Sequence, residues 1–591
     1  MTSNHHLSDE AFTALAHGDG DPGVIRELRE AQYSKHLMLI RIVAQAAAEA
    51  DQASKAVAAF QAGYELLAAV QAADPDSLTW LVGLPHIGAW GHDCLTRLDQ
   101  GLAPDLGYLA DAAASAAVRA GVGFDLDLPV RDGRVLFPGL GYFHGVDADS
   151  WIRATSDGKR LSLGAFAEAP CADICPDDGA GRVIPHWTGS PLIRAVTDGQ
   201  VWEVLLETAD PHLDRYTLPM VGELDEAGLA AWREQIQRAW TLLVRHHGWA
   251  SGPMAAGTCV IVPMAARAED DLDSATSPIA FGAIATCLPP DPVTTAETLV
   301  HEFQHLKLGA LLDLVRMVEP SEELLYAPWR PDPRPPAGLL QGVYAHLGVA
   351  RFWEAQRHVE AEPDDVFLAH LRYERWRPTI ELCASTLMGT ESLTPEGARF
   401  VAVLCDRGRS LAPSTASTEA RDIAEELTLD HWLTWQLRHT VADASQVAEL
   451  AAAYRRGEPR GHRSLPEVRL KKDTREVGST VRSRLLNLRY LEPQGRVGPL
   501  PAGLPGVTAA DVLLLDRRAE AAVAAYRDEI SAAADPTPAP WIGLALAVRK
   551  LGSSPVQEAL ATRMPVIFDL HAHLSNLGVD SDPLAIADWC A

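Results

Sequence analysis

The segment 297–309, ETLVHEFQHLKLG, carries two histidines and a glutamate in the order His301-Glu302-x-x-His305. Residues four apart on a helix project from the same face, so both imidazoles could bind one divalent metal ion. In zinc peptidases with this spacing, the glutamate is the general base that activates a metal-bound water. The spacing therefore predicts a metal site, and it leaves open which metal is bound and which reaction is served.

The residues around the motif indicate a buried helix. Thr294 and Glu297 have the spacing of a capping box just after Pro292, which predicts that the helix starts there. Leu308 and Leu312 continue the stripe of the two histidines, so this face is expected to point inward. Buried imidazoles are costly unless a partner satisfies them, and a divalent metal would do so. The alternative is a pair of hydrogen-bonded core histidines.

A metal site also needs a third protein ligand. Leu308 and Leu311 stand where the metzincin pattern requires glycine and histidine, so that pattern fails. The segment 338–358 is expected to form a second helix, with His346 in its apolar middle and Glu354 near its polar end. We expect His346 to be the third ligand. The alternatives are Glu354 and an acidic residue of the segment VEPSEELLY, namely Glu319, Glu322 or Glu323.

Two arginines lie between these helices, in LLYAPWRPDPRPPAG at 324–338. Five prolines stiffen this segment, so Arg330 and Arg334 are expected to point in fixed directions. A peptidase gains little from them, whereas an oxygenase with a dicarboxylic cosubstrate needs a guanidinium for the distal carboxylate. The alternative is that both are arginines of a surface loop.

The chain has 591 residues, a formal net charge of −28 and no run of apolar residues long enough to cross a bilayer. Its first residues lack the pattern of a signal peptide, so we expect a soluble cytoplasmic protein without membrane contact. The acidic balance argues against nucleic-acid binding.

The scattered cysteines are expected to be reduced core residues. The basic stretch 455–489 is expected to be a solvated linker, with docking of an acidic peptide as the alternative.

The hydrophobic pattern predicts an α+β fold that is predominantly helical. We expect a helical N-terminal domain at 1–120, a β-rich section at 121–225, a metal-binding core at 226–395 and a helical C-terminal domain at 396–591. Within the core, apolar strands are expected at 257–264 and 277–289. The helix that carries the motif would pack on this small sheet, as in zincins.

Three segments resemble the HExxH-motif peptide-modification family that accompanies ribosomal peptide natural-product precursors. They are AFTALAHGDGDPGVIRELREAQYSKHLMLIRIV, HEFQHLKLGALLDLV and YAPWRPDPRPPAGLLQGVYAHLGVARFW. The resemblance spans nearly the whole chain, with the specific motifs at 294–357. It implies an α-ketoglutarate (2-oxoglutarate)-dependent peptide β-hydroxylase with Fe(II) on His301 and His305, and O2 as cosubstrate. It also favours His346 as a ligand and Arg330 or Arg334 for the cosubstrate.

The resemblance further implies a precursor peptide as substrate and other peptide-modifying enzymes of the same pathway as partners. The peptide is expected to bind as an added strand along 277–289. Frequent Ala, Arg, Pro and Gly fit a bacterial chain from a GC-rich genome.

Two other functions remain open at this point. One is a zinc metallopeptidase with Glu302 as the general base; in the hydroxylase, Glu302 would instead orient a ligand or act as an occasional carboxylate ligand. The other is a peptide-binding scaffold without catalytic activity, which would be purified without metal.

Overall fold

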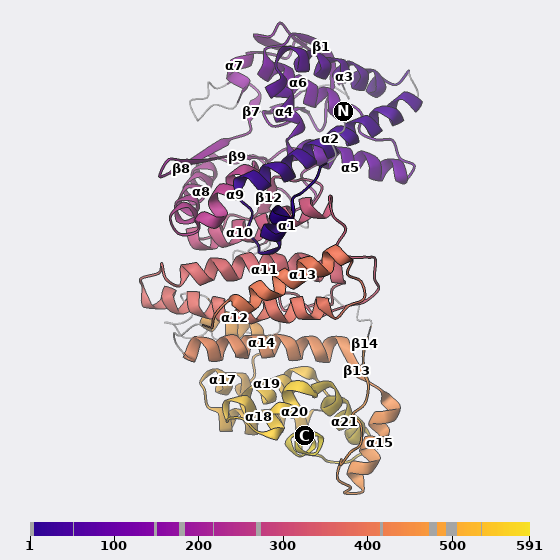
Figure 1. Ribbon diagram of the computed structural model, residues 1–591, viewed down its shortest axis with the longest axis vertical. Helices are drawn as coiled ribbons and strands as arrows, with labels where there is room; N and C mark the ends of the chain where they lie inside the picture. The colour runs from indigo at the N-terminus through magenta and orange to yellow at the C-terminus, as the bar shows by residue number, and fades with distance from the viewer. Residues whose placement is uncertain are drawn as a thin grey trace. The chain divides into compact units, whose positions relative to one another are not determined.

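The computed structural model describes residues 5–591 except 51–52, 147–150, 176–183, 217, 267–272, 414–417, 472–480, 492–504 and 534. The described chain is mostly helical with small sheets, as the sequence predicts (Figure 1). It divides into two compact units. The first comprises Met1–Met317, Tyr344–Phe352 and Thr394–Leu404; the second comprises Val318–Val343, Trp353–Leu393 and Cys405–Ala591.

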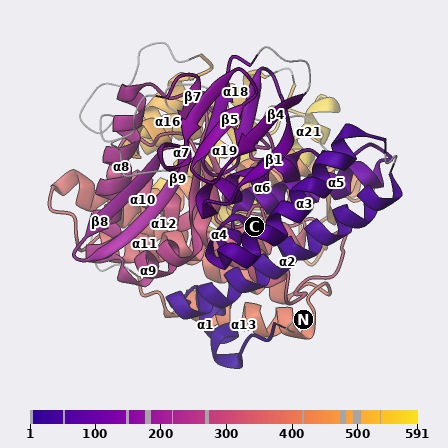
Figure 2. The same ribbon diagram turned by 90° about the horizontal axis from the view of Figure 1, so that it is seen from above.

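The first unit begins with helices rich in alanine and leucine. They are α1 (Asp9–Ala16), α2 (Pro22–Glu49), α3 (Lys55–Ala73), α4 (Pro75–Val82), α5 (Pro85–Asp99) and α6 (Tyr108–Ala120). Figure 2 shows α2 running beside α3 and α5. A side chain on Gly63 would meet the backbone of Ala110 at 3.0 Å, so the small residues let α3 and α6 approach closely.

The expected β-rich section follows as two small antiparallel sheets. One has the order β1 (Phe124–Pro129), β4 (Trp151–Ser156), β5 (Arg160–Leu163) and β6 (Ala167–Pro170), after which comes the short helix α7 (Cys171–Ile174). The other has the order β2 (Arg134–Phe137), β3 (Gly141–His144) and β7 (Trp187–Gly189). Their apolar faces join the core formed by α3 and α6.

A five-stranded mixed sheet supports the HExxH helix. Its order is β11 (Ser274–Ala275), β12 (Ala283–Thr286), β10 (Val260–Pro263), β9 (Gln200–Leu206) and β8 (Leu192–Thr197). The chain reaches β10 through α8 (Glu226–His246) and α9 (Gly248–Gly257), and it continues from β12 into α10 (Pro292–Leu312). All residues of β10 and β12 are buried, which fits their apolar sequences.

Both apolar strands predicted upstream of the motif are present as β10 and β12, each shorter than expected. The expected site for an added peptide strand needs correction. β12 pairs with β10 on one side and with β11 on the other, so 277–289 offers no open edge at its strand. Within the described residues, the edge strand at this end of the sheet is β11.

Helix α11 (Pro336–Gln356) contributes to both units: residues 344–352 belong to the first. The rest of the second unit is built mainly from helices around a core that includes Trp541 and Ile567. They are α12 (Pro363–Met388), α13 (Pro395–Ser410, whose first part belongs to the first unit), α14 (Thr418–His439), α15 (Ala444–Arg455), α16 (Val481–Tyr490), α17 (Ala509–Leu515), α18 (Ala519–Ala532), α19 (Pro538–Lys550), α20 (Pro555–Thr562), α21 (Met564–Asn576) and α22 (Pro583–Cys590). A two-stranded sheet of β13 (Thr440–Ala442) and β14 (Val468–Leu470) completes it.

The basic stretch 455–489 is partly structured. Residues 472–480 lie outside the described residues, but β14 and the start of α16 fall within the stretch. Arg482 is buried and donates to Asp430 at 2.6 Å. Helix α16 is therefore an element of the core and not part of a solvated linker, whereas the residues of β14 are exposed.

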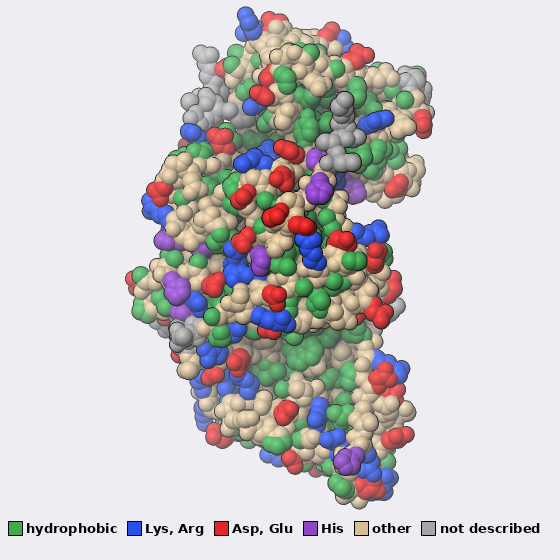
Figure 3. Space-filling view, viewed as in Figure 1, with side chains coloured by type: hydrophobic (Ala, Val, Ile, Leu, Met, Phe, Trp, Pro, Cys, Tyr) green, Lys and Arg blue, Asp and Glu red, His purple; other side chains and the backbone are tan. Residues whose placement is uncertain are grey.

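The surface drawn in Figure 3 carries acidic and basic side chains interspersed with uncharged ones. Among the described residues, no helix combines the length and apolar character needed to cross a membrane.

Candidate metal centre

Asp291 and Pro292 start the helix that carries the motif. Oδ1 of Asp291 accepts hydrogen bonds from the backbone N–H of Val293 and Thr294 at 2.8 and 2.9 Å. The expected cap at Thr294 is therefore wrong. The cap is Asp291, three residues earlier, and the Thr294 hydroxyl itself donates to Asp291. Aspartate at the N-cap and proline at the first helical position are both favoured at the start of a helix.

Three imidazoles from two helices lie together in the first unit. The ring centroid of His301 is 4.9 Å from that of His305 on α10 and 5.1 Å from that of His346 on α11. His346 is buried. The structure thus brings the histidine expected as the third ligand beside the HExxH motif.

The ring spacing can be compared with that of a metal site. Imidazole nitrogens about 2.1 Å from a metal place the ring centroids about 4.5–5.2 Å apart at ligand angles of about 90–109°. Both centroid distances fall in this range. Even so, no group of three or more His, Cys, Asp or Glu residues in the described part of the chain is arranged to hold a metal ion. The residues therefore fit a metal in kind and in ring spacing, although their donor atoms do not form a metal-holding group in this structure.

Desolvation keeps His301 neutral, although 24% of its side chain remains exposed. Desolvation lowers the pKa of His301 to about 4, with Glu302 opposing the shift and His305 adding to it. A neutral imidazole has a free lone pair, which is the form that binds a metal. The site therefore offers this ligand in its binding form at neutral pH.

Glu302 is buried beside the imidazoles and is held by the edge strand. The hydroxyl of Ser274 on β11 donates to Oε1 of Glu302 at 2.6 Å. This same oxygen lies 3.9 Å from Nε2 of His301. The other oxygen, Oε2, is buried and has no hydrogen-bond partner among the described residues. A buried carboxylate oxygen without a partner is costly and is a place where a ligand or water can bind.

The spacing of α10 and α11 depends on a glycine. A side chain on Gly348 would lie 2.6 Å from Cγ of Gln304, the residue before His305. Gln304 also donates to the carbonyl of Gly18 at 3.3 Å, and Lys307 donates to the carbonyls of Gly18 and Asp19, both at 2.9 Å. The loop between α1 and α2 is thereby fixed to the helix that carries the motif.

The two loop arginines, expected to bind a cosubstrate, share a carboxylate of their own loop. Nε of Arg330 donates to Oδ1 of Asp332 at 2.9 Å, and Nη1 of Arg334 donates to Oδ2 at 3.1 Å. Burial opposes the shift, but these hydrogen bonds hold the pKa of Asp332 below its usual range. Both arginines lie in the second unit and remain partly exposed.

The alternative ligands also lie in the second unit. Glu354 forms an ion pair with Arg407 at 3.7 Å. Glu319, Glu322 and Glu323 lie in the segment between α10 and α11.

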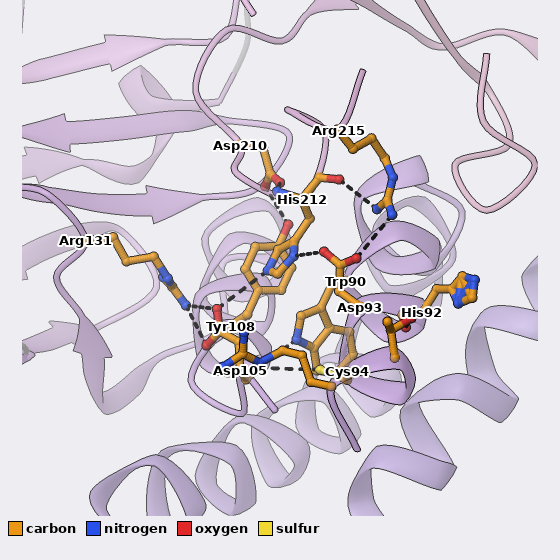
Figure 4. Close-up of polar contacts among 12 residues, drawn as sticks. Trp90, His92, Asp93, Cys94, Asp105, Tyr108, Arg131, Asp210, His212 and Arg215 are labelled. Atoms are coloured by element: carbon orange, nitrogen blue, oxygen red, sulfur yellow. Dashed lines mark hydrogen bonds and ion pairs between the residues drawn. The ribbon is translucent and has the colours of Figure 1, made fainter. Parts of the chain in front are cut away.

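A second polar cluster, around His212, was not foreseen from the sequence (Figure 4). His212 lies between the carboxylates of Asp93 and Asp105, at 2.8 and 3.5 Å, in the loop after β9. Burial alone would lower the pKa of His212, but Asp105 and Asp93 outweigh it and raise the pKa to about 9. Arg131 donates to both oxygens of Asp105, which extends the cluster to the turn between β1 and β2.

The His212 cluster joins the N-terminal helices to the strands. The hydroxyl of Tyr108 on α6 donates to Asp210 at 2.6 Å, and Nε2 of His86 on α5 lies 2.9 Å from Glu207. These groups pair with one another, as in a structural network, although Nδ1 of His86 and Nε2 of His212 are buried without a hydrogen-bond partner among the described residues. The partners lie about 100 residues apart in sequence, so no local pattern could have revealed them.

Comparison with models of known protein families gives no match, and comparison with curated proteins gives none either.

Proposed function

We propose that the protein is an Fe(II)- and 2-oxoglutarate-dependent hydroxylase that adds a β-hydroxyl to residues of a ribosomally made precursor peptide. The observation that carries this proposal is the group of three neighbouring imidazoles, His301, His305 and His346, beside the buried carboxylate of Glu302. Iron with 2-oxoglutarate and O2 supplies the oxidant for hydroxylation of a C–H bond. The proposal includes a zincin-like arrangement, in which the HExxH helix α10 packs on a small sheet.

In the proposed site, the three histidines hold the metal through neutral nitrogens. Three neutral ligands leave the charge of a divalent ion uncompensated, and Glu302 provides one negative charge next to it. Ser274 fixes Oε1, so Oε2 is the oxygen that can accept a hydrogen bond from a group bound at the metal. The role of Glu302 is therefore to orient a ligand and balance charge.

The cosubstrate is bound by the guanidinium of Arg330 or Arg334 through its distal carboxylate. Both arginines already hold a carboxylate, that of Asp332, in hydrogen bonds of ordinary length. Both guanidinium groups therefore bind carboxylate oxygens readily, and 2-oxoglutarate would have to compete with Asp332.

The peptide is proposed to add at β11 instead of along 277–289. A strand added there would run beside Ser274, whose hydroxyl contacts Glu302. Backbone hydrogen bonds at a sheet edge would hold a peptide of any sequence. Side-chain contacts would then select the residue that is modified.

A zinc peptidase is the second candidate, because the unpaired Oε2 of Glu302 would also suit a general base. Glu302→Gln separates the two functions. A peptidase loses nearly all hydrolysis with this change, whereas a hydroxylase retains partial turnover because its carboxylate transfers no proton in the main step.

The first experiment measures metal and cosubstrate binding without a peptide. Fe(II) and then 2-oxoglutarate are added anaerobically to the metal-free protein, and the visible spectrum is recorded. We expect a weak charge-transfer band only when both are present. The band should be lost in His301→Ala, His305→Ala and His346→Ala, and retained in His358→Ala, which removes an exposed histidine.

Each outcome has a clear meaning. Tight zinc binding without any band contradicts the hydroxylase and favours the peptidase. A protein that binds neither metal is a scaffold. A band that survives His346→Ala would exclude this histidine as a ligand, and Glu354→Ala would then be tested.

A further inference from the structure

The second unit contains a cavity of about 220 Å³ that the proposed reaction does not use. It lies among α12, α14, α16 and the proline-rich segment 324–338. Figure 1 shows α12 and α14 running side by side, and α16 packs on α14.

Aromatic rings form much of the cavity wall. Trp329, Trp376 and Trp435 all line it. Trp435 is held in place by Trp432, whose ring is stacked on it at a centroid distance of 5.7 Å. The ring of Trp329 fits against α11 because Gly342 has no side chain there; a Cβ atom would lie 2.3 Å from the ring. Flat rings fixed in this way present apolar faces to an occupant.

The proline-rich segment is fastened to α14 and completes the wall. The hydroxyl of Tyr326 lies 2.8 Å from Nδ1 of His431, and Nε2 of His439 donates to the carbonyl of Pro331 at 2.6 Å. Burial lowers the pKa of His431 to about 4, so its imidazole is neutral. The wall is therefore rigid, and His431 adds no charge to it.

The cavity is lined by a guanidinium that makes no hydrogen bond among the described residues. Arg375 lines it and packs against the ring of Trp376 at 4.9 Å, but forms no hydrogen bond or ion pair with any described residue. Asp430 is a nearby carboxylate, yet its two oxygens accept from Nε of Arg482 at 2.6 Å and from the hydroxyl of Ser483 at 2.5 Å. Asp430 therefore attracts Arg375 only at longer range and accepts no hydrogen bond from it, which leaves the N–H groups of Arg375 for a ligand.

Two further polar groups at the cavity lack partners. Both Nε1 of Trp435 and Oγ1 of Thr434 are buried without a hydrogen-bond partner among the described residues. Burying such groups is unfavourable unless an occupant or water satisfies them.

We propose that this cavity binds a carboxylate carried on a flat apolar group. Arg375 would pair with the carboxylate, and the three tryptophan rings would enclose the flat part. The carboxylate can come from a free aromatic acid or from an aromatic residue at the C-terminus of a peptide. This proposal does not rest on the reaction proposed above, although Trp329 and Pro331 of the cavity wall flank Arg330 in the chain.

Isothermal titration of the full-length protein with indole-3-acetate tests the proposal, with indole-3-acetamide as the matched neutral probe. We expect the acid to bind with a Kd below about 1 mM and the amide to bind about tenfold more weakly or worse. The tripeptide Gly-Gly-Trp and its C-terminal amide are titrated in the same way, to test a peptide C-terminus as the source of the carboxylate. Tighter binding of the free peptide than of indole-3-acetate assigns the peptide as the source; the reverse order assigns the free acid.

Variants locate the binding. Arg375→Gln should weaken binding of indole-3-acetate about tenfold or more, whereas Arg375→Lys keeps the charge and should weaken it less. Arg409→Gln, which changes an exposed arginine paired with Glu381, should leave binding unchanged. Circular dichroism confirms folding, and Arg375→Lys replaces Arg375→Gln if the latter does not fold. Absence of binding by all four probes, equal binding of acid and amide, or a full-strength interaction in the folded Arg375 variant overturns the proposal.

Discussion

The hydroxyl of Ser274 lies 2.6 Å from Oε1 of Glu302 and ties a two-residue edge strand to the helix that bears the HExxH motif. Glu302 is only 2% exposed, and its other oxygen has no partner among the described residues. Ser274→Ala should therefore lower the free energy of unfolding by about 1–3 kcal/mol. Urea denaturation at neutral pH measures this loss. Ser274→Thr keeps the hydroxyl and serves as the control; equal stability of the alanine and wild-type proteins would contradict the importance of this hydrogen bond.

The start of α10 yields a second prediction. Asp291→Ala removes the acceptor of two backbone N–H groups and should destabilise the protein by about 1 kcal/mol. Thr294→Ala removes only a hydroxyl that donates to Asp291 and should cost less. The two variants are compared by urea denaturation. The reverse ranking would restore Thr294 as the cap.

Asp332 occupies the two guanidinium groups that the proposed function assigns to the cosubstrate. Asp332→Asn removes the competing charge, so 2-oxoglutarate should bind the Fe(II)-loaded protein several-fold more tightly. Arg330→Ala or Arg334→Ala should weaken it. Titration of the charge-transfer band against 2-oxoglutarate gives these affinities. Unchanged affinity in all three variants would move the cosubstrate carboxylate to another residue.

The His212 cluster makes stability depend on pH in a defined direction. The pKa of His212 is raised to about 9, so the stabilisation from its charged form is fully present below pH 6.5 and is lost as the pH rises through about 9. Its size is on the order of 3 kcal/mol. Burial opposes the shift at Asp105, but the hydrogen bond with His212 and the charge of Arg131 lower its pKa to about 2, so its contribution is present above pH 3.8 and is lost as the pH falls toward 2.

Midpoints of urea denaturation measured between pH 6 and pH 10 test the loss of stability as His212 loses its proton. His212→Gln should flatten the dependence across this range, although His86, whose pKa is also raised because Glu207 and Asp210 outweigh burial, should leave a smaller slope. A wild-type midpoint that does not fall between pH 6.5 and pH 9 would show that His212 is not charged in the folded protein.

The sequence predicted the existence of the two helices of the site better than the cap of α10 or the partners of the loop arginines. The period of apolar residues was enough to find α10 and α11 and to place His346 in the buried middle of α11. The signal for the true cap was present in Asp291-Pro292, but the capping-box spacing of Thr294 competed with it. Asp332 stands between the two arginines in sequence, so their pairing could have been anticipated from charge alone.

Other features have no local signal. A strand of two residues such as β11 is too short to produce an alternating pattern, so the true edge of the sheet was missed. The cavity around Arg375 depends on rings from α12, α14 and the segment before α11, which approach one another only through tertiary packing. Sequence periodicity shows which side chains are buried but not which buried charges remain without a partner.

The close approach of Gly348 to Gln304 has a consequence for how related chains are recognised. A search for HExxH spacing alone retrieves peptidases and chance matches alike. In chains with this helix pair, we expect the residue two positions after the downstream histidine to covary in size with the residue before the second histidine of the motif. A larger residue at one position requires a smaller one at the other, because both occupy the same space between the helices. That correlated pair, and not the motif by itself, would distinguish relatives that keep all three imidazoles together.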